Sequence, residues 1–280
     1  MTANGLLVHF AGSSLHFKTR HPDLLSALET HFRHCLGSGG GVLAEYEITP
    51  AADGQFAIAR DGSQILTQAD LPRALAQLMQ DGLTQLNGAS HTHLVFHAAA
   101  LAFQEQGLVL CGRTGSGKST LAAGLVAGGF QYLTDEVIAW PAQGEDQISG
   151  FCRSIALKRG SRFIWERWGD QQPVQGLLCL NDGGAWIAST LLNPAAVRAS
   201  AAPRLLLFPR FAAESPLQAE PLTSGEALFQ LLQCLVNARN FSDGGMEAAA
   251  RLARSAPAFR LAYSNWEDVH QWILQRMQTG

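Results

Sequence analysis

The ten residues 111–120, CGRTGSGKST, constrain the possible folds of this 280-residue chain more than any other segment. The segment fits the spacing G-x-x-x-x-G-K-[ST] through Gly112, Gly117, Lys118 and Ser119. Given the chain's own composition, a chance match is expected on the order of 0.004 times per chain, so the pattern is specific. A segment of this kind connects a strand to a helix, and it therefore predicts an α/β fold.

The flanking segments have the composition that such a loop needs. The segments Leu108–Cys111 and His93–Phe103 are apolar enough for buried strands, and Lys118–Val126 is rich in Ala and Leu as in a helix. Gln131–Trp140 predicts a further strand. The order strand, loop, helix, strand predicts a βαβ-type unit.

The spacing of the loop suits the binding of a nucleotide phosphate. Gly115 and Gly117 let the backbone wrap closely around an anion, and the following helix directs its N-terminal amides toward it. Lys118 is expected to reach the β- and γ-phosphates and Ser119 to ligate Mg²⁺. Thr114 and Ser116 are interpreted as loop-forming residues, and Arg113 as a solvated arginine within reach of phosphate. The predicted nucleotide-binding residues are Gly112, Arg113, Thr114, Gly115, Ser116, Gly117, Lys118, Ser119 and Thr120.

An adjacent acidic pair, Asp135 and Glu136, follows the predicted helix. Successive side chains of a strand point to opposite faces, so we expect the two carboxylates to have different tasks. One would accept the proton of an attacking hydroxyl and the other would bind the metal. The alternative is a salt bridge that only stabilises the end of the strand.

His97 lies on the strand that precedes the loop strand. A single histidine in an apolar strand is usually a satisfied core residue. His91, His93 and His97 share parity, which would allow a zinc site, but no fourth ligand is in view.

Composition narrows the class of protein further. Charged residues are 15% of the chain, hydrophobic residues are 47%, and 20 basic against 23 acidic residues give a net charge of −3. No broad basic field exists, so we expect no binding of bulk nucleic acid. No apolar stretch approaches 18 residues and no signal peptide is evident, so we expect no membrane span and a cytoplasmic location. The five scattered cysteines predict free thiols.

The first 88 residues predict a small α+β domain without phosphate-binding or acid–base groups, which we interpret as a recognition or assembly module. The segment Asn87–Ser90 is the expected boundary to a second domain, residues 91–280. Gly37–Gly41 is interpreted as a flexible turn. Further strands are expected at Leu6–Phe10, Leu15–Lys18, Leu43–Ile48, Phe56–Ala59, Ile148–Leu157, Arg204–Phe211 and Phe259–Tyr263. Further helices are expected at Pro22–Leu36, Pro72–Gln85, Ser161–Trp168, Thr223–Asn240, Met246–Arg254 and Trp266–Met277.

Residues 97–140, HAAALAFQEQGLVLCGRTGSGKSTLAAGLVAGGFQYLTDEVIAW, resemble the catalytic domain of HPr kinase/phosphorylase and its shorter relatives. The resemblance implies a kinase for a serine-type hydroxyl, with a fold similar to phosphoenolpyruvate carboxykinase and with ATP and Mg²⁺ as cofactors. It implies Asp135 as catalytic base with His97 nearby, and Glu136 as a residue that helps to hold the metal. In the segment SIALKRGS, Lys158 corresponds to a lysine that stabilises the transferring phosphoryl group, and Arg153 is a weaker candidate.

The chain also departs from that family's pattern. Glu136 replaces a second aspartate, the N-terminal residues do not match, and no segment corresponds to the one that contacts HPr. The chain is more similar to the kinases found with peptide-modification systems, including lasso-peptide tailoring kinases. The acceptor hydroxyl is therefore expected on a protein, a peptide or a small molecule, and a homo-oligomer is possible. The alternatives are a P-loop NTPase, a nucleotide-sensing module without phosphotransfer, and a carboxykinase-like enzyme.

Overall fold

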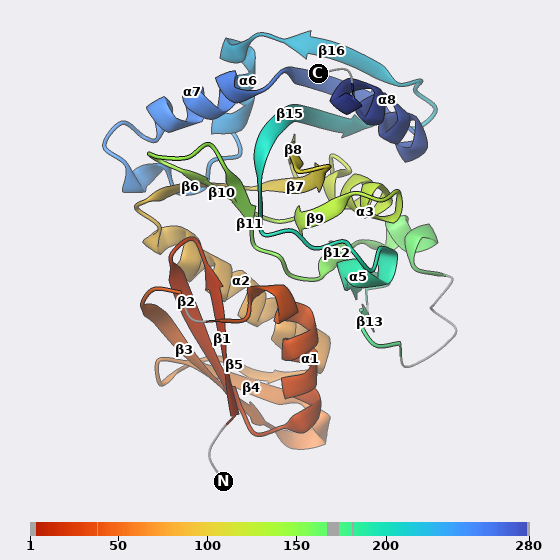
Figure 1. Cartoon of the computed structure of the whole chain (residues 1–280). Coiled ribbons are helices and arrows are strands. Elements are labelled where there is room, and N and C mark those ends of the chain that lie inside the picture. Colours follow the sequence, from red (N-terminus) through yellow and green to blue (C-terminus); the bar gives the residue numbers. More distant parts are fainter. Residues whose placement is uncertain (1–3, 38, 167–173, 181, 279–280) are drawn as a thin grey trace.

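The computed structural model describes residues 4–37, 39–166, 174–180 and 182–278. It is a mixed α/β structure in which the N-terminal sheet and a larger sheet come from separate parts of the chain (Figure 1). Within the described residues, the N-terminal sheet has the order β1-β2-β3-β4-β5. Its strands are β1 (Asn4–Phe10), β2 (Ser13–Thr19), β3 (Val42–Pro50), β4 (Phe56–Arg60) and β5 (Ser63–Ala69).

Two helices accompany this sheet: α1 (Pro22–Phe32), which continues into the 3₁₀ turn η1 (Arg33–Cys35), and α2 (Leu71–Ala89). Pro22 lies in the first turn of α1, where its missing N–H costs nothing. Because α1 crosses over between them, β2 and β3 are parallel, whereas the neighbouring pairs are antiparallel.

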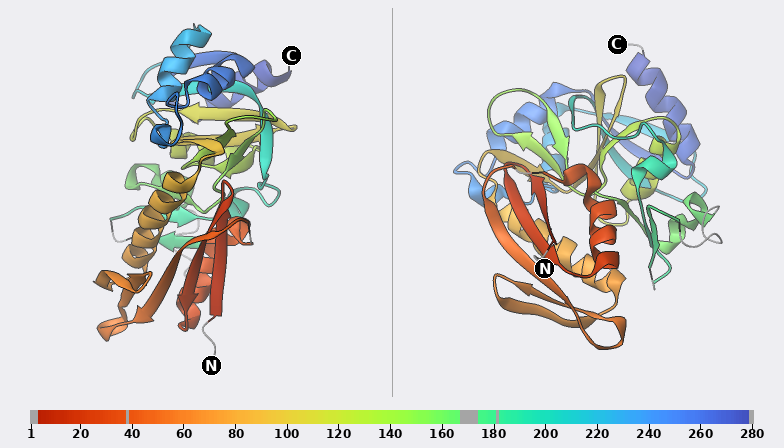
Figure 2. Two further views of the ribbon diagram at one scale, coloured as in Figure 1. Left: turned by 90° about the vertical axis from the view of Figure 1, so that its left-hand side faces the viewer. Right: turned by 60° about the horizontal axis from the view of Figure 1, so that its bottom comes forward.

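Helix α2 continues to Ala89, so the expected helix end at Gln85 is wrong, and residues 87–89 of the expected domain boundary are helical. The reason is a tertiary cap, since Asn240 Nδ2 donates to the carbonyls of Gly88 (2.9 Å) and Ser90 (2.8 Å). These contacts satisfy carbonyl groups that the end of a helix leaves without partners. Figure 2 shows α2 running from the N-terminal sheet toward the larger part of the molecule.

Within the described residues, the larger sheet has the order β6-β10-β11-β15-β8-β7-β9, with β17 beside β15 and β16 beside β17. Strands β8, β15 and β17 are mutually parallel, and the other pairs are antiparallel. The bounds are β6 (His93–Phe96), β7 (Ala98–Phe103), β8 (Gln106–Cys111), β9 (Gln131–Thr134), β10 (Ile138–Pro141), β11 (Ile148–Gly150), β15 (Ser200–Phe211), β16 (Gln218–Leu222) and β17 (Ala258–Tyr263).

Helix α3 (Lys118–Ala127) connects β8 to β9. Both of these strands pair antiparallel with β7, so they run parallel to each other with one strand between them. The expected order of strand, loop, helix and strand is confirmed, and β7 is inserted into the crossover.

Two long strands of the sequence interpretation are each divided in the structure. His93–Phe103 divides at His97 into β6 and β7, and Gln131–Trp140 divides at residues 135–137 into β9 and β10. Strand β6 pairs with β10, whereas β7 pairs with β9. The segments β6–β7 and β9–β10 therefore both change pairing partner at the same level of the sheet. These coincident breaks bring His97 next to the acidic pair.

The C-terminal helices are α6 (Ser224–Leu232), α7 (Met246–Ser255) and α8 (Trp266–Gln278), and they cover the larger sheet in Figure 1. Thr223 and Glu226 form a capping box at the start of α6, and Asn265 Oδ1 accepts from Glu267 N at the start of α8. The long helix expected over Thr223–Asn240 is wrong beyond Leu232. Residues after Cys234 instead lie along β6, with Val236 N donating to Val95 O (2.9 Å), and end in the 3₁₀ turn η4 (Ala238–Asn240).

A small sheet of β12 (Ile155–Leu157), β14 (Ala185–Ile187) and β13 (Leu177–Cys179) lies between the N-terminal and larger sheets. The expected strand Ile148–Leu157 is therefore divided into β11 and β12. The expected helix Ser161–Trp168 is the 3₁₀ turn η3 (Arg159–Ile164), and its last two positions lie outside the described residues. The remaining short elements are η2 (Ala52–Gly54) and α5 (Ser189–Leu192).

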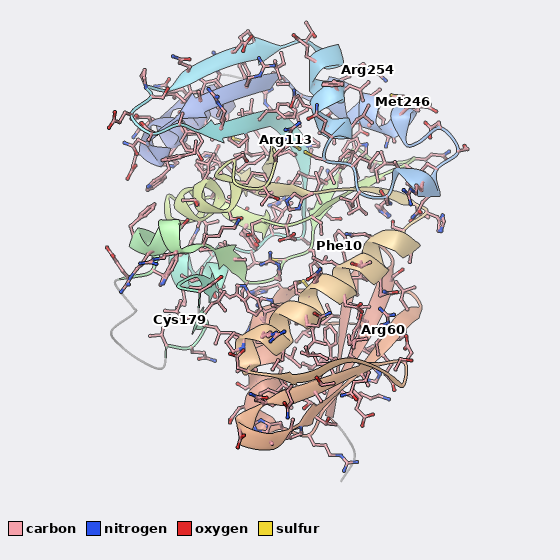
Figure 3. The ribbon with its side chains drawn as sticks, turned by 180° about the vertical axis from the view of Figure 1, so that it is seen from behind. Phe10, Arg60, Arg113, Cys179, Met246 and Arg254 are labelled. Carbon is pink, nitrogen blue, oxygen red and sulfur yellow. The ribbon has the colours of Figure 1, made fainter. Side chains whose placement is uncertain are left out.

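One hydrophobic cluster extends from the N-terminal sheet into the larger part. Phe151 contacts Phe10 and Phe32, with ring centroids 5.5 and 6.0 Å apart, and Phe10 lies at this junction in Figure 3. His31 stacks on Trp186 at 4.5 Å. Of the helices that the structure describes, none is long and apolar enough to cross a membrane.

Candidate functional site

The Gly-rich loop between β8 and α3 depends on glycine at two positions. Gly115 and Gly117 have φ values of 87° and 95°, a region that side-chain-bearing residues rarely adopt. A Cβ atom on Gly117 would also lie 2.5 Å from Tyr263 Oη. The loop is fixed to the end of β15, because Phe211 N donates to Ser116 O at 3.0 Å. The sequence therefore forms a tight backbone turn at the N-terminus of α3.

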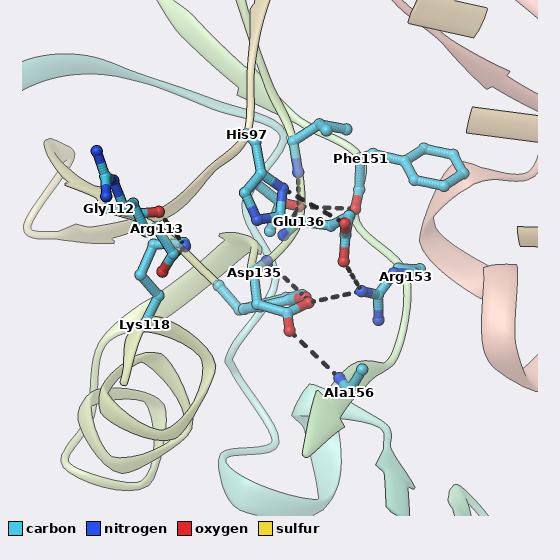
Figure 4. A network of polar contacts seen from close by, with 12 residues as sticks. His97, Gly112, Arg113, Lys118, Asp135, Glu136, Phe151, Arg153 and Ala156 are labelled. Carbon is cyan, nitrogen blue, oxygen red and sulfur yellow. Dashed lines mark hydrogen bonds and ion pairs between the residues drawn. The ribbon is translucent and has the colours of Figure 1, made fainter. Parts of the chain in front are cut away.

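Lys118 is buried beneath this loop. Its ammonium group donates to the carbonyl oxygens of Gly112 (2.5 Å) and Arg113 (3.3 Å), as Figure 4 shows. Burial lowers the pKa of Lys118, while the nearby carboxylates of Glu136 and Asp135 oppose that change. The lysine charge thus lies within the electrostatic reach of the acidic pair.

The remaining loop residues differ in exposure. Arg113, Thr114 and Gly115 are exposed, whereas Ser116, Ser119 and Thr120 are half-buried. Ser116 Oγ is buried and has no hydrogen-bond partner among the described atoms. Gly112 is also held closely, because a Cβ atom there would lie 2.8 Å from Ser116 Oγ.

Asp135 is only 2% exposed and both of its carboxylate oxygens have partners. Tyr132 Oη donates to Oδ1 at 2.8 Å, and Ala156 N donates to Oδ2 at 3.3 Å. Arg153 Nη2 lies 3.5 Å from Oδ1. Tyr132, which the sequence analysis did not single out, lies three residues before Asp135 and its hydroxyl also accepts from Asp135 N.

Glu136 is more accessible, with a side chain that is 29% exposed. Arg153 Nη2 donates to its Oε2 at 2.5 Å, and His97 Nδ1 lies 3.5 Å from Oε1. Burial by itself would raise the pKa of Glu136, but the His97 contact and the Arg153 charge lower it to about 2. Glu136 is therefore ionised at neutral pH.

The expectation that the acidic pair faces opposite sides of a strand is wrong. Residues 135–137 lie between β9 and β10, where strand alternation does not apply, and both carboxylates contact the same arginine. They nevertheless differ in exposure, because Asp135 faces the interior and Glu136 faces a cavity.

Arg153 is the centre of this cluster (Figure 4). Its side chain is only 3% exposed and it pairs with both carboxylates. Burial by itself would lower the pKa of Arg153, but the charges of Asp135 and Glu136 raise it. From the sequence, Arg153 is a weaker candidate than Lys158 for stabilising the transferring phosphoryl group. The available signal was its position between Phe151–Cys152 and Ile155, where apolar neighbours indicate a buried arginine.

Lys158 is exposed and does not join the cluster. Two hydrogen bonds through Ser161 connect its backbone to helix α3. Ser161 N donates to Lys158 O, and Ser161 Oγ lies 2.6 Å from Thr120 Oγ1. Within the described part of the chain, the Lys158 ammonium group has no hydrogen bond or ion pair.

His97 is not a satisfied core histidine, since its side chain is 34% exposed and contacts Glu136. Its backbone N–H donates to Cys234 O at 2.7 Å. The three-histidine zinc hypothesis is not met by the geometry. His91 lies 3.4 Å from the carbonyl of Asn240 and His93 lies 2.9 Å from Thr92 Oγ1, and no group of three or more metal-ligating side chains exists among the described residues.

The cluster and the loop are adjacent because of strand register. Ala98 of β7 pairs with Cys111 of β8, so His97 lies beside Gly112 at the start of the loop. A cavity of about 410 Å³ opens on the other side of the cluster, against α2. The Gly-rich loop thus lies at one site with the side chains of Lys118, Asp135, Glu136, Arg153 and His97.

No family model and no curated protein matches the chain. Among solved structures, the chain is similar to the Hpr(Ser) kinase/phosphatase from Coxiella burnetii, with 15% sequence identity and a TM-score of 0.35 over 66% of this chain and 88% of that one. This likeness carries no argument about activity, so function follows from the residues of the site.

Proposed function

We propose that this protein is an ATP- and Mg²⁺-dependent kinase that transfers a phosphoryl group to a serine-type hydroxyl. The observation that carries the proposal is the pairing of Ala98 with Cys111, which aligns the Gly-rich loop with the cluster of His97, the acidic pair and Arg153. A Gly-rich loop of the phosphate-binding type next to a buried carboxylate, Asp135, and a second one, Glu136, that faces a cavity supports phosphoryl transfer more than simple nucleotide binding.

In this proposal the loop binds the nucleotide phosphates. Backbone amides of residues 112–117 and the N-terminus of α3 face the anion, and Lys118 exchanges its carbonyl partners for the β- and γ-phosphates. Lys158 and Arg153 are the candidate cations for the transferring group. The docking of Ser161 on Thr120 supports Lys158, because it holds that segment beside the loop helix.

Ser119 and Glu136 are suited to hold Mg²⁺, because a hydroxyl and an ionised carboxylate are the hard oxygen ligands that this ion prefers. Ser119 is half-buried at the start of α3, and Glu136 is ionised because its pKa is about 2. The bound ion would neutralise charge on the phosphates. His97 and Arg153 orient the Glu136 carboxylate.

Asp135 is the proposed general base. A carboxylate offers about four lone-pair sites, and Tyr132, Ala156 and Arg153 occupy three of them. One site remains for the acceptor hydroxyl, and the three fixed partners hold the carboxylate rigidly. A positioned base of this kind contributes about 10²–10⁴-fold to the rate.

The direct test is Lys118→Ala, measured by calorimetry with ATP and by phosphoryl transfer. Lys118 is the cation of the loop motif, so its removal should weaken ATP binding or abolish transfer. Lys18→Ala is the matched control, because Lys18 pairs with Glu45 on the N-terminal sheet. Unchanged affinity and unchanged transfer in Lys118→Ala would refute the proposed function.

A further inference from the structure

The cavity beside the cluster has one wall from the larger part of the molecule and one from α2. Its volume is about 410 Å³, within the range of sites for small molecules and single peptide side chains. His97, Glu136 and Arg153, which lie close together in Figure 4, are among its lining residues. The other lining residues are Ala76, Met79, Gln80, Leu83, Thr84, Asn87, Val137, Ala156, Trp186 and Val236.

The α2 wall is a single stripe of one helix face. Its members, Ala76, Met79, Gln80, Leu83, Thr84 and Asn87, recur with helical spacing and all are uncharged. The opposite face of α2 packs on the N-terminal sheet, where a Cβ atom on Gly82 would lie 2.7 Å from Leu15 Cδ1. Ala76, Gln80 and Thr84 are exposed and lie at the rim of the cavity. Met79 and Leu83 contribute to the hydrophobic cluster, so core packing accounts for these two members of the stripe but not for Ala76, Gln80 and Thr84.

The charges that line the cavity are already neutralised by one another. Glu136 pairs with both His97 and Arg153, and Arg153 also pairs with Asp135. Among the described residues that line the cavity, none offers a free cation to an acidic acceptor or a free carboxylate to a basic one. The remaining lining is mainly apolar, so an uncharged ligand fits best.

We propose that this cavity is the acceptor site, and that α2 selects a hydroxyl carried on an uncharged, mainly apolar group. A serine side chain between apolar residues of a peptide and a free neutral alcohol share this chemistry. The assignment rests on the proposed function. In the transfer, the acceptor oxygen forms a bond to the γ-phosphorus of ATP and the bond to the β,γ-bridging oxygen breaks. The hydroxyl proton passes to the proposed base Asp135, which does not itself line the cavity but contacts the lining residues Arg153 and Ala156. The products are ADP and a phosphate ester.

Binding is tested separately from transfer by methyl NMR of the full-length protein. The probes are N-acetyl-Ala-Leu-Ser-Leu-Ala amide, its analogues with Lys or Glu in place of both Leu residues, and N-acetylserine amide as the free alcohol. We expect the Leu peptide to move the Met79 methyl resonance, assigned by Met79→Leu, and to leave that of the exposed, distant Met246 unchanged. A response of equal strength to N-acetylserine amide would identify a free alcohol, and not a peptide, as the carrier of the acceptor hydroxyl.

Selectivity is tested with two chemically identical changes on α2. Gln80 lines the cavity and Gln77, one turn earlier, does not. Gln80→Glu should improve the KM of the Lys peptide relative to the Leu peptide by about two- to fivefold, as expected for one exposed charge pair. Gln77→Glu should leave this ratio unchanged.

The two proposals fail in different ways. The acceptor site is overturned if the Met79 methyl does not respond to any probe, or if Gln80→Glu and Gln77→Glu behave alike. It is also overturned if charged and neutral peptides are phosphorylated equally, or if none is phosphorylated by protein that binds ATP. If only the proposed function is wrong, ATP binding will not depend on Lys118. The NMR experiment would then still show whether the probes bind in the cavity.

Discussion

Asp135 combines a structural contact with the role of a proposed base, and these two roles can be separated. Asp135→Asn keeps the shape but removes the base and one negative charge beside Arg153. We expect nucleotide binding to persist and phosphoryl transfer to fall by about 10²–10⁴-fold. The measurements are melting temperature, ATP affinity and transfer rate on one preparation.

Tyr132→Phe is the control for this experiment, because it removes the hydroxyl that donates to Asp135 Oδ1 and keeps the carboxylate. It should cost about 1 kcal/mol of stability with a much smaller loss of rate. If Asp135→Asn instead lost stability but transferred phosphate at a near-normal rate per folded molecule, the residue would be structural. The nucleotide-sensing alternative would then gain support.

Glu136 predicts a pH dependence with a defined sign. Its pKa in the folded protein is lowered from 4.5 to about 2, so the ionised form stabilises the fold above the unfolded-state pKa. That contribution is lost as the pH falls through about 4.5 toward 2. The unfolding free energy of Glu136→Gln should therefore be about 2 kcal/mol below wild type at pH 7, and the difference should shrink at acidic pH.

Urea unfolding of both proteins at several pH values measures this difference. Glu105→Gln is a matched control, because Glu105 is 83% exposed and pairs with Arg198 at 3.4 Å. Its effect should stay below about 0.5 kcal/mol at every pH. A Glu136→Gln difference that was constant with pH would show that the carboxylate charge does not stabilise the fold.

At the scale of residues, sequence reasoning identified the side chains but not their pairing. The acidic pair, His97 and Lys118 were all predicted and lie around one site. Arg153 was ranked below Lys158, because sequence distance does not show which cation is buried between two carboxylates. That pairing depends on the route of the chain after Gly150, which no local pattern encodes.

At the scale of elements, the strands were predicted in type but not in continuity. The segments through His97 and through residues 135–137 read as single strands because apolar residues flank these positions on both sides. Each break arises where the pairing partner changes. In the first segment, β6 pairs with β10 whereas β7 pairs with β8 and β9. In the second segment, β9 pairs with β7 whereas β10 pairs with β6. Hydrophobic periodicity carries no information about partners, so the feature that assembles the site could not be predicted.

The Gly-rich turn gives the element-scale prediction. Gly117 has φ 95° and no space for a Cβ atom, so Gly117→Ala should destabilise the protein by more than about 1 kcal/mol and weaken ATP binding. Gly88→Ala is the control, because Gly88 lies in the last turn of α2 with open space around it. It should leave ATP binding unchanged and stabilise the protein by about 0.5–1 kcal/mol. Thermal unfolding and calorimetry decide, and full ATP affinity in Gly117→Ala would contradict the loop assignment.

At the scale of the whole molecule, the expected N-terminal domain of residues 1–88 corresponds to a sheet with its own strands, but it shares a core with the rest. Phe10 and Phe32 both pack on Phe151, and His31 is buried against Trp186. Burial, followed by the charge of Arg153, keeps the pKa of His31 low. The N-terminal part therefore contributes to the surroundings of the cluster as well as the α2 wall, and we propose that it is a recognition module built into the site.

This shared core predicts that the molecule unfolds in one cooperative transition. Phe151→Ala removes the aromatic side chain of the larger part on which Phe10 and Phe32 of the N-terminal part pack. It should therefore cost about 3–5 kcal/mol and lower the transition of the entire protein. Phe229→Ala is the control, because Phe229 is 64% exposed and should change stability by less than about 0.5 kcal/mol. Calorimetry measures the number of transitions, and hydrogen exchange reports on β1–β5 and on β7–β8 separately. In Phe151→Ala, exchange in both sheets should accelerate together, because both sheets pack on one hydrophobic cluster. Two resolved transitions, or acceleration in only one sheet, would show that residues 1–88 fold independently of the rest of the chain.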